Sequence, residues 1–345
     1  MKLLMWIFCH ILFVSHGEGE ETRQIGVRFV LDNMYQDLFL KYHSNRSAYL
    51  DVYLQAFLNS ASLFFRDLKN PSLEFVLVGT YNTTINNTFL ASKNKGNNEE
   101  FLYLLQDLGI RQNFSSDDLV FFLHPYQWQA SYEFQTSFFD GFCKFRGYGF
   151  GHDDARTFSG VTMAARQFAR LLGANADSIS GCQSSTFLMA NNRSSPEVHT
   201  LSNCSRRAIE YKLQTIKDCT CLRTNSSVPV NSTYLPSHFL SGTDLCTMQN
   251  EKYTVCDILF SPKSGTQHTQ AFVFSCFVAC CEKGTKGKWS VILAPDGTQS
   301  KECQLCLAGK CTNETTASLG SAAEQALVNV SPIKKRSFLT LEREC

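Results

Sequence analysis

The stretch 162-TMAARQFARLLGANAD-177 decides how the rest of the chain is interpreted. Together with the residue before it, its apolar residues recur at the spacing of one face of an α-helix. They are Val161, Ala165, Phe168 and Leu172. Thr162, Arg166 and Arg170 fall together on another face, and Gly173 marks the end of the helix. The plain interpretation is an amphipathic helix whose arginines form a solvated stripe.

The segments around this helix alternate between strand and helix patterns. Apolar runs bounded by turn residues predict strands over 24–32, 73–81 and 118–126. Helical spacing predicts helices over 46–68 and 99–109, and a later helix over 205–217 with Ser205 as its N-cap. Strands separated by helices imply an α/β fold built on a mixed, mostly parallel sheet.

The N-terminus predicts a secretory signal peptide. Lys2 precedes an apolar run from Leu3 to Val14, and small residues follow at Ser15 and Gly17. The run is too short to span a bilayer, so we expect cleavage near Gly17 and no membrane span. The formal net charge of +1 gives no reason to expect nucleic acid as a partner.

Cysteines and glycosylation sequons also indicate a secreted, extracellular protein. The chain has 15 cysteines, and loss of Cys9 with the signal leaves an even set that can form disulfides. That set is Cys143, Cys182, Cys204, Cys219, Cys221, Cys246, Cys256, Cys276, Cys280, Cys281, Cys303, Cys306, Cys311 and Cys345. Sequons predict glycans at Asn45, Asn82, Asn86, Asn113, Asn192, Asn225, Asn231, Asn313 and Asn329. A further sequon at Asn203 precedes Cys204, where a disulfide could block it.

Cysteine density divides the mature chain. Only Cys143 and Cys182 precede Cys204, so the first region must fold around its own hydrophobic core. The second region has less apolar material and needs disulfides. The expected divisions are a signal peptide over 1–17, an α/β domain over 18–222, a linker over 223–235 and a loop-rich, cysteine-rich domain over 236–345.

The opening stretch also has the spacing of a zinc-protease motif without its ligands. Metzincins carry His-Glu-x-x-His-x-x-Gly-x-x-His, in which three histidines bind zinc and the glutamate is the general base. With Gly173 as the glycine, Arg166 and Arg170 stand at the first two histidine positions. Gln167 stands at the glutamate position and Ala176 at the third histidine position.

Further landmarks follow this motif in order. Asp177 comes next, and 182-CQSSTFLMANN-192 carries Met189 as the methionine turn of metzincins does. The segments 201-LSNCSRRAIEYKL-213 and 219-CTCL-222 are similar to the last helix and closing cysteines of reprolysin domains. Segments similar to the cysteine-rich module of that family are 276-CFVACC-281, 294-APDGT-298 and 306-CLAGKC-311. The chain therefore resembles the reprolysin (adamalysin) metalloproteases, particularly those secreted in the saliva of blood-feeding ticks.

The resemblance implies a metzincin-like metalloprotease domain in which Gly173, Asp177 and Met189 are structural residues. It also implies disulfides from Cys182 to Cys204, and from Cys143 to either Cys221 or Cys219. It departs from the family at Ser300, where a cysteine commonly follows the PDGT sequence, and Cys303 could substitute. Active members usually carry a long prodomain, whereas the strand over 24–32 follows the expected signal cleavage closely.

The four substitutions remove the chemistry of the motif. A guanidinium group has no lone pair for a metal, and alanine offers no ligand. Glutamine cannot act as the general base that a glutamate provides. The remaining histidines have no helical or short-loop spacing, and His152 in 151-GHDD-154 is the nearest substitute. We therefore expect no bound cofactor in this chain, although active members of the family hold zinc.

The leading hypothesis is a secreted, glycosylated, catalytically inactive homologue that acts by binding extracellular proteins. The tick resemblance implies host proteins of haemostasis or immunity as partners. A sheet edge beside the helix would hold an extended peptide, and Arg166 and Arg170 would give the cleft an anion-preferring floor. Two alternatives stay open: an active secreted zinc metalloendopeptidase with non-standard ligands, and a structural or decoy glycoprotein.

Overall fold

The structure is a computed structural model, and only part of the chain is described. The described residues are 22–43, 49–69, 71–84, 98–125, 136–182, 186–190, 200–216, 221, 233–256, 276–283, 289–299 and 305–313. The expected signal peptide over 1–17, most of the expected linker over 223–235, and Cys219, Cys303 and Cys345 lie outside these ranges. Below, residues 22–221 are the N-terminal part and residues 233–313 the C-terminal part.

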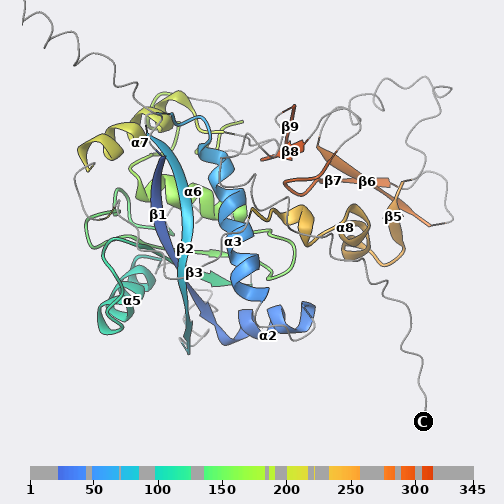
Figure 1. The fold of residues 1–345 in the computed structure, drawn as a ribbon, viewed down its shortest axis with the longest axis horizontal. Helices are drawn as coiled ribbons and strands as arrows, with labels where there is room; N and C mark the ends of the chain where they lie inside the picture. The colour runs from blue at the N-terminus through green and yellow to red at the C-terminus, as the bar shows by residue number, and fades with distance from the viewer. Residues whose placement is uncertain are drawn as a thin grey trace, which may run out of the picture.

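A parallel sheet lies at the centre of the N-terminal part (Figure 1). Its strands are β1 (Thr22–Asp32), β2 (Ser72–Thr83), β3 (Leu119–His124) and β4 (Tyr148–His152). They are ordered β2-β1-β3-β4, and every neighbouring pair is parallel. Beyond β4, Ser137 forms an isolated antiparallel bridge with Gly149. The α/β class and the mostly parallel sheet expected from the sequence are therefore confirmed.

Helices cover both faces of this sheet. The described helices of the N-terminal part are α2 (Asn33–Tyr42), α3 (Tyr49–Ser62, continued by a 3-10 turn over Leu63–Phe65), α5 (Asn98–Arg111), α6 (Val161–Leu171) and α7 (Asn203–Thr215). Strand residues alternate between faces, so neighbouring phenylalanines of β3 meet different helices. The Phe121 ring contacts Phe168 of α6, whereas the Phe122 ring contacts Phe101 of α5. Every residue of β3 is buried, as a strand covered on both faces requires.

Three local features differ from the sequence-based expectations. The strand β4 and the helix α2 were not predicted, although Asp32 caps α2 by accepting a hydrogen bond from the Tyr35 N–H. The N-cap of α7 is Ser202 and not Ser205, so that prediction was wrong. Ser202 has an extended backbone, and its hydroxyl accepts a hydrogen bond from the Ser205 N–H.

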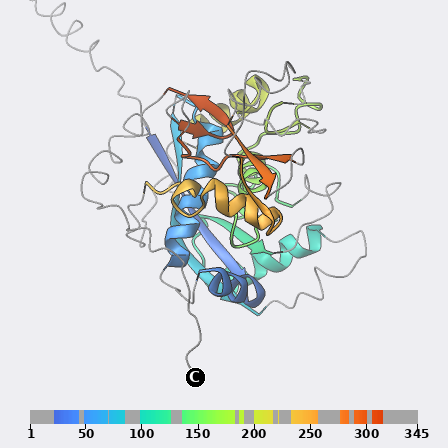
Figure 2. The same ribbon diagram turned by 90° about the vertical axis from the view of Figure 1, so that its right-hand side faces the viewer.

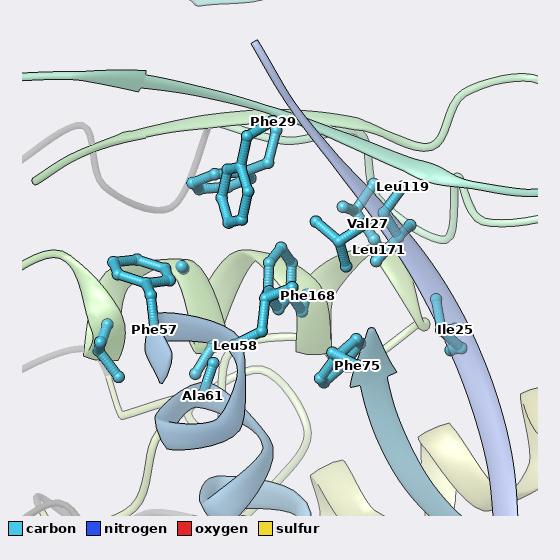
Figure 3. Close-up of a cluster of buried hydrophobic side chains, with 14 of the residues drawn as sticks. Ile25, Val27, Phe29, Phe57, Leu58, Ala61, Phe75, Leu119, Phe168 and Leu171 are labelled. Carbon is cyan, nitrogen blue, oxygen red and sulfur yellow. The ribbon is translucent and has the colours of Figure 1, made fainter. Parts of the chain in front are cut away.

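The largest part of the core fills the space between the sheet, α3 and α6 (Figure 3). The Phe168 ring lies at its centre, 4.8 Å from the ring of Phe75 and 5.2 Å from that of Phe121. Phe29 of β1 packs edge-on against Phe57 of α3. Phe29 and Phe121 are register partners, so aromatic packing holds α3 and α6 side by side on the same face of the sheet.

The C-terminal part is a small disulfide-rich unit. Its elements are a 3-10 turn (Pro236–His238), α8 (Gly242–Gln249), β5 (Tyr253–Val255), β6 (Phe277–Glu282), β7 (Trp289–Leu293), β8 (Leu305–Leu307) and β9 (Lys310–Thr312). Strands β5, β6 and β7 form an antiparallel sheet in that order, and β8 pairs with β9. Three disulfides join described residues of the unit: Cys246–Cys280, Cys256–Cys281 and Cys276–Cys306.

The C-terminal part packs directly against α3 (Figures 1 and 2). Asp296 lies there partly buried, and its carboxylate accepts hydrogen bonds from the Ser60 hydroxyl and from the Ala308 N–H, the latter at 2.5 Å. Burial raises the pKa of Asp296 to about 6. Arg66 donates to the Leu307 carbonyl at 3.1 Å. The two parts therefore share one continuous core.

Two disulfides join segments of the N-terminal part. They are Cys143–Cys221 and Cys182–Cys204. The family resemblance implied the second pair, and it left Cys221 and Cys219 open as partners of Cys143. Together with the three of the C-terminal part they fit an oxidising, extracellular compartment. Among the described residues, no helix is long and apolar enough to cross a bilayer.

The sequon asparagines divide between described and undescribed residues. Those described, Asn82, Asn113, Asn203 and Asn313, all have exposed side chains. The others lie outside the described ranges.

Replacing Phe168 tests the importance of the core. We expect Phe168→Ala to lower the free energy of unfolding by about 3–5 kcal/mol, because it leaves a cavity between α6, Phe75 and Phe121. The same substitution at Phe145, which is 73% exposed, should change it by less than about 0.5 kcal/mol. Urea denaturation of both variants measures the difference, and equal losses would contradict the packing described above.

Candidate functional site

The candidate site is built around the C-terminal end of α6. The helix ends at Leu171, and Gly173 follows with a φ of +91°, a conformation that glycine adopts without strain. The Gly173 N–H donates to the Arg170 carbonyl at 3.0 Å, and the Ala174 N–H to the Ala169 carbonyl at 2.9 Å. Gly173 therefore ends the helix and turns the chain, as the sequence predicts.

A turn from a distant segment lies against the residues that follow the helix. It contains Leu188 and Met189, both fully buried, and is closed by the Ala190 N–H donating to the Phe187 carbonyl at 3.1 Å. The Asp177 N–H donates to the Met189 carbonyl at 3.0 Å. Met189 is thus a core residue next to the end of the site, and its carbonyl holds the chain after Gly173.

Asp177 connects the site to α7. Its carboxylate is buried and accepts hydrogen bonds from the hydroxyls of Ser202 and Ser205, the latter at 3.1 Å. The Cys182 N–H donates to the Asp177 carbonyl at 2.9 Å, next to the disulfide with Cys204. These contacts make Asp177 a structural residue that fixes the start of α7.

Arg166 lies inside the protein. Its side chain is 1% exposed, and its Nη2 donates to the Ala190 carbonyl at 2.8 Å. The side chain therefore supports the turn that contains Met189. Both expectations that placed Arg166 at the surface, in a solvated stripe or on the floor of an open cleft, are wrong for this residue.

Gln167 and Arg170 contact the segment around Ser137, which lies along the outer edge of β4. The Ser137 hydroxyl donates to Gln167 Oε1 at 2.7 Å, and Arg170 Nε donates to the Ser137 carbonyl at 3.2 Å. Arg170 also lies over the Phe139 ring, at 5.5 Å from its centroid, and is half-buried. Burial lowers the pKa of Arg170 from its ordinary value, and its guanidinium remains charged at any physiological pH.

These contacts occupy the sheet edge at Ser137. Thr136 and Phe138 use their backbone groups to pair with Phe150 and Tyr148, at 2.8 and 3.3 Å. In an antiparallel pair the next residue directs its N–H and C=O away from the partner strand. The Ser137 carbonyl therefore faces outward, where an added peptide strand would bind, and Arg170 already occupies it.

The residues at this site do not fit a zinc ion. Arg166, Gln167 and Arg170 bind groups of the protein itself, and neither a guanidinium nor the buried methyl group of Ala176 can coordinate a metal. Within the described ranges, no group of three or more His, Cys, Asp and Glu side chains could hold a metal ion.

Sequence spacing missed a polar cluster at the carboxyl ends of the strands. Asp32 ends β1, and His124 and His152 end β3 and β4 as register partners. His124 Nδ1 lies 2.6 Å from Asp32 Oδ2, and both side chains are buried. The parallel register brings these residues together, and their separation along the chain gives no signal of it.

The same end of the sheet holds a buried carboxyl group. Asp153 accepts hydrogen bonds from the Tyr35 and Tyr53 hydroxyls, both at 2.9 Å, and from the N–H groups of Ala155 and Gly160 at 3.0 and 3.1 Å. Burial raises the pKa of Asp153 to about 6. Asp153 thus joins α2, α3 and the loop that leads to α6.

Comparisons with known proteins identify no family for this chain. No protein-family model matches it, and no curated protein matches it. Among solved structures, it is similar to one described as "Structure of a chaperone-substrate complex", with a TM-score of 0.36 and 13% identity. That likeness covers 57% of this chain and 35% of the other chain, so this chain spans about a third of that one. A likeness of this size supports no functional conclusion.

Asp153 should give the protein a recognisable pH dependence. The pKa of about 6 in the folded state lies above the value of about 3.9 for an unfolded aspartate, so the folded state holds the proton more tightly. The stability that this group contributes is therefore complete below about pH 4 and lost as pH rises through 6, by up to about 3 kcal/mol.

The comparison is between the wild type and Asp153→Asn in urea denaturation from pH 4 to pH 7.5. The variant should lose this component of the pH dependence, whatever its absolute stability. Asp107→Asn, at a carboxyl group 59% exposed, should keep the wild-type profile. A profile for Asp153→Asn parallel to that of the wild type would contradict the assignment.

Proposed function

We propose that this protein is a secreted, glycosylated, catalytically inactive homologue of the reprolysin metalloproteases that acts by binding extracellular proteins. The proposal rests on the ordered motifs of the sequence and on one observation. Arg166, Gln167 and Arg170, which the resemblance places at metal-ligand and general-base positions, form hydrogen bonds with the protein itself. Groups that hold the fold together in this way are not available to activate water.

The surroundings of these residues support the same proposal. Gly173 adopts the backbone turn that the motif needs, and Met189 is buried against the segment after it. Features that serve the fold are therefore kept, whereas the groups that serve zinc chemistry are replaced. A protein with this combination keeps a shaped surface for recognition and lacks the means to hydrolyse a peptide.

The experiment that tests this function measures bound zinc. After expression in a secretory host and dialysis against trace zinc, plasma mass spectrometry should find well under about 0.1 zinc per chain, because the site offers guanidinium groups and no imidazole. Circular dichroism confirms that the same sample is folded. Nearly one zinc per chain, with chelator-sensitive cleavage of gelatin, would instead establish a metalloendopeptidase with non-standard ligands.

Restoring the motif gives a matched control. The quadruple variant R166H/Q167E/R170H/A176H should gain about one zinc per chain if the scaffold is metzincin-like. The triple variant R166H/R170H/A176H keeps Gln167, so it should bind zinc and hydrolyse at least about 100-fold more slowly than the quadruple variant. Failure of both folded variants to bind zinc would remove the family assignment.

A further inference from the structure

A groove lies at the junction of the N-terminal and C-terminal parts. It encloses about 470 Å³, a volume within the range of ligand sites. On the N-terminal side it is lined by Tyr42 at the end of α2 and by the loop residues Asp154, Arg156 and Thr157. This groove is separate from Arg166 and Arg170, which no wall of it includes.

The opposite wall is mostly apolar. It is formed by Leu245, Met248 and Gln249 of α8 and by Val291 and Ile292 of β7. Consecutive residues of a strand point to opposite faces, so a groove lined by both Val291 and Ile292 runs along the edge of the strand. Methionine side chains adapt to irregular partners, which suits a surface that receives a peptide side chain.

On the edge of β7 that faces away from β6, no strand of the described part of the chain pairs with the backbone groups. β7 is the last strand in the order β5-β6-β7. The Ala294 N–H donates to the Cys276 carbonyl at 2.7 Å, and register then makes Ile292 and Val278 a hydrogen-bonded pair. Val291 therefore directs its N–H and C=O away from β6.

The bonds on the far side of β6 agree with this assignment. The Cys256 N–H donates to the Ala279 carbonyl at 3.0 Å, so Ala279 pairs toward β5 and not toward Val291. Leu293 lies two residues after Val291, so its N–H and C=O also point away from β6. The open edge of β7 next to the groove thus offers the N–H and C=O groups of two residues, as a short docking strand needs.

Arg156 gives the groove a positive charge. Its guanidinium lies over the Tyr42 ring, 4.8 Å from the centroid, and forms no hydrogen bond or ion pair with any described residue. Lys41 approaches the same ring at 5.8 Å. The carboxylate of Asp154, which also lines the groove, is held by the N–H groups of Arg156 and Thr157 and by the Thr157 hydroxyl.

We propose that this groove binds an extended peptide segment of a partner protein, which adds as a strand to the open edge of β7. An acidic side chain of the peptide pairs with Arg156, and apolar side chains pack against Leu245 and Met248. The inference rests on the proposed function in that it names a site and a partner class for a protein that acts by binding.

Fluorescence anisotropy with defined probes tests the proposal. The probe is a fluorescein-labelled peptide of eight residues that alternates valine and glutamate. It should bind the full-length protein at least about tenfold more tightly than its valine–lysine counterpart, and more weakly as salt concentration rises. The same acidic peptide with N-methylated backbone amides should lose at least about tenfold in affinity, because it cannot form strand hydrogen bonds.

Two variants and a control locate the binding. Arg156→Gln should weaken binding of the acidic peptide about tenfold, whereas Arg111→Gln, at an arginine 64% exposed on α5, should leave it within twofold. Val291→Pro removes an N–H that faces outward and no bond to β6, so the strand should persist and peptide affinity should fall about tenfold.

Several results would overturn the inference. They are no binding of the acidic peptide at about 1 mM, equal affinity for the N-methylated peptide, or unchanged affinity in Arg156→Gln. Tighter binding of dodecanoate than of the peptide would instead assign the groove to a small amphiphile. A zinc-containing, hydrolytic protein that binds the peptide would overturn the proposed function alone, and a metal-free protein that ignores the peptide would overturn this inference alone.

Discussion

The hydrogen bond from the buried guanidinium of Arg166 to the Ala190 carbonyl is the contact on which the rest of the site depends. A charge removed from water must find acceptors within the protein, so this side chain fixes the turn that carries Met189. The Met189 carbonyl of that turn accepts a hydrogen bond from the Asp177 N–H. The Asp177 carboxylate accepts hydrogen bonds from the Ser202 and Ser205 hydroxyls at the start of α7. One series of contacts thus runs from α6 to α7, and a side chain at a metal-ligand position of the resemblance supports the fold.

Much of the fold could be predicted from the sequence, because its signals are local. Apolar runs located β1, β2 and β3, and Gly173 marked the end of α6. β4 escaped prediction because its sequence, Tyr148–His152, has two glycines and little apolar alternation. α2 escaped because it begins directly after a strand, and its signal was limited to the capping side chain of Asp32.

The site was harder to predict because its contacts join distant segments. Periodicity separates Arg166 from the apolar face of α6, which favours exposure. Yet the turn with Met189 covers the polar face of the helix at Arg166, and the segment around Ser137 covers it at Arg170. Likewise, His124 and His152 meet only because β3 and β4 are parallel and in register. Helical spacing describes which residues share a face, and the tertiary structure decides what covers it.

Two sheet edges lie near arginines, and they differ in whether their outward backbone groups already have a partner. At Ser137 the outward carbonyl already accepts a hydrogen bond from Arg170 Nε, so a residue at a metal-ligand position of the resemblance occupies the edge next to α6. At Val291 no described residue pairs with the outward groups. Across the groove the Arg156 guanidinium lies over the Tyr42 ring and forms no hydrogen bond or ion pair within the described ranges. An unpaired edge is a template for another strand, and its short length limits uncontrolled association. The residues at the metal-ligand positions of the resemblance hold the fold, and the peptide binding that we propose uses a different sheet edge, at the junction of the two parts.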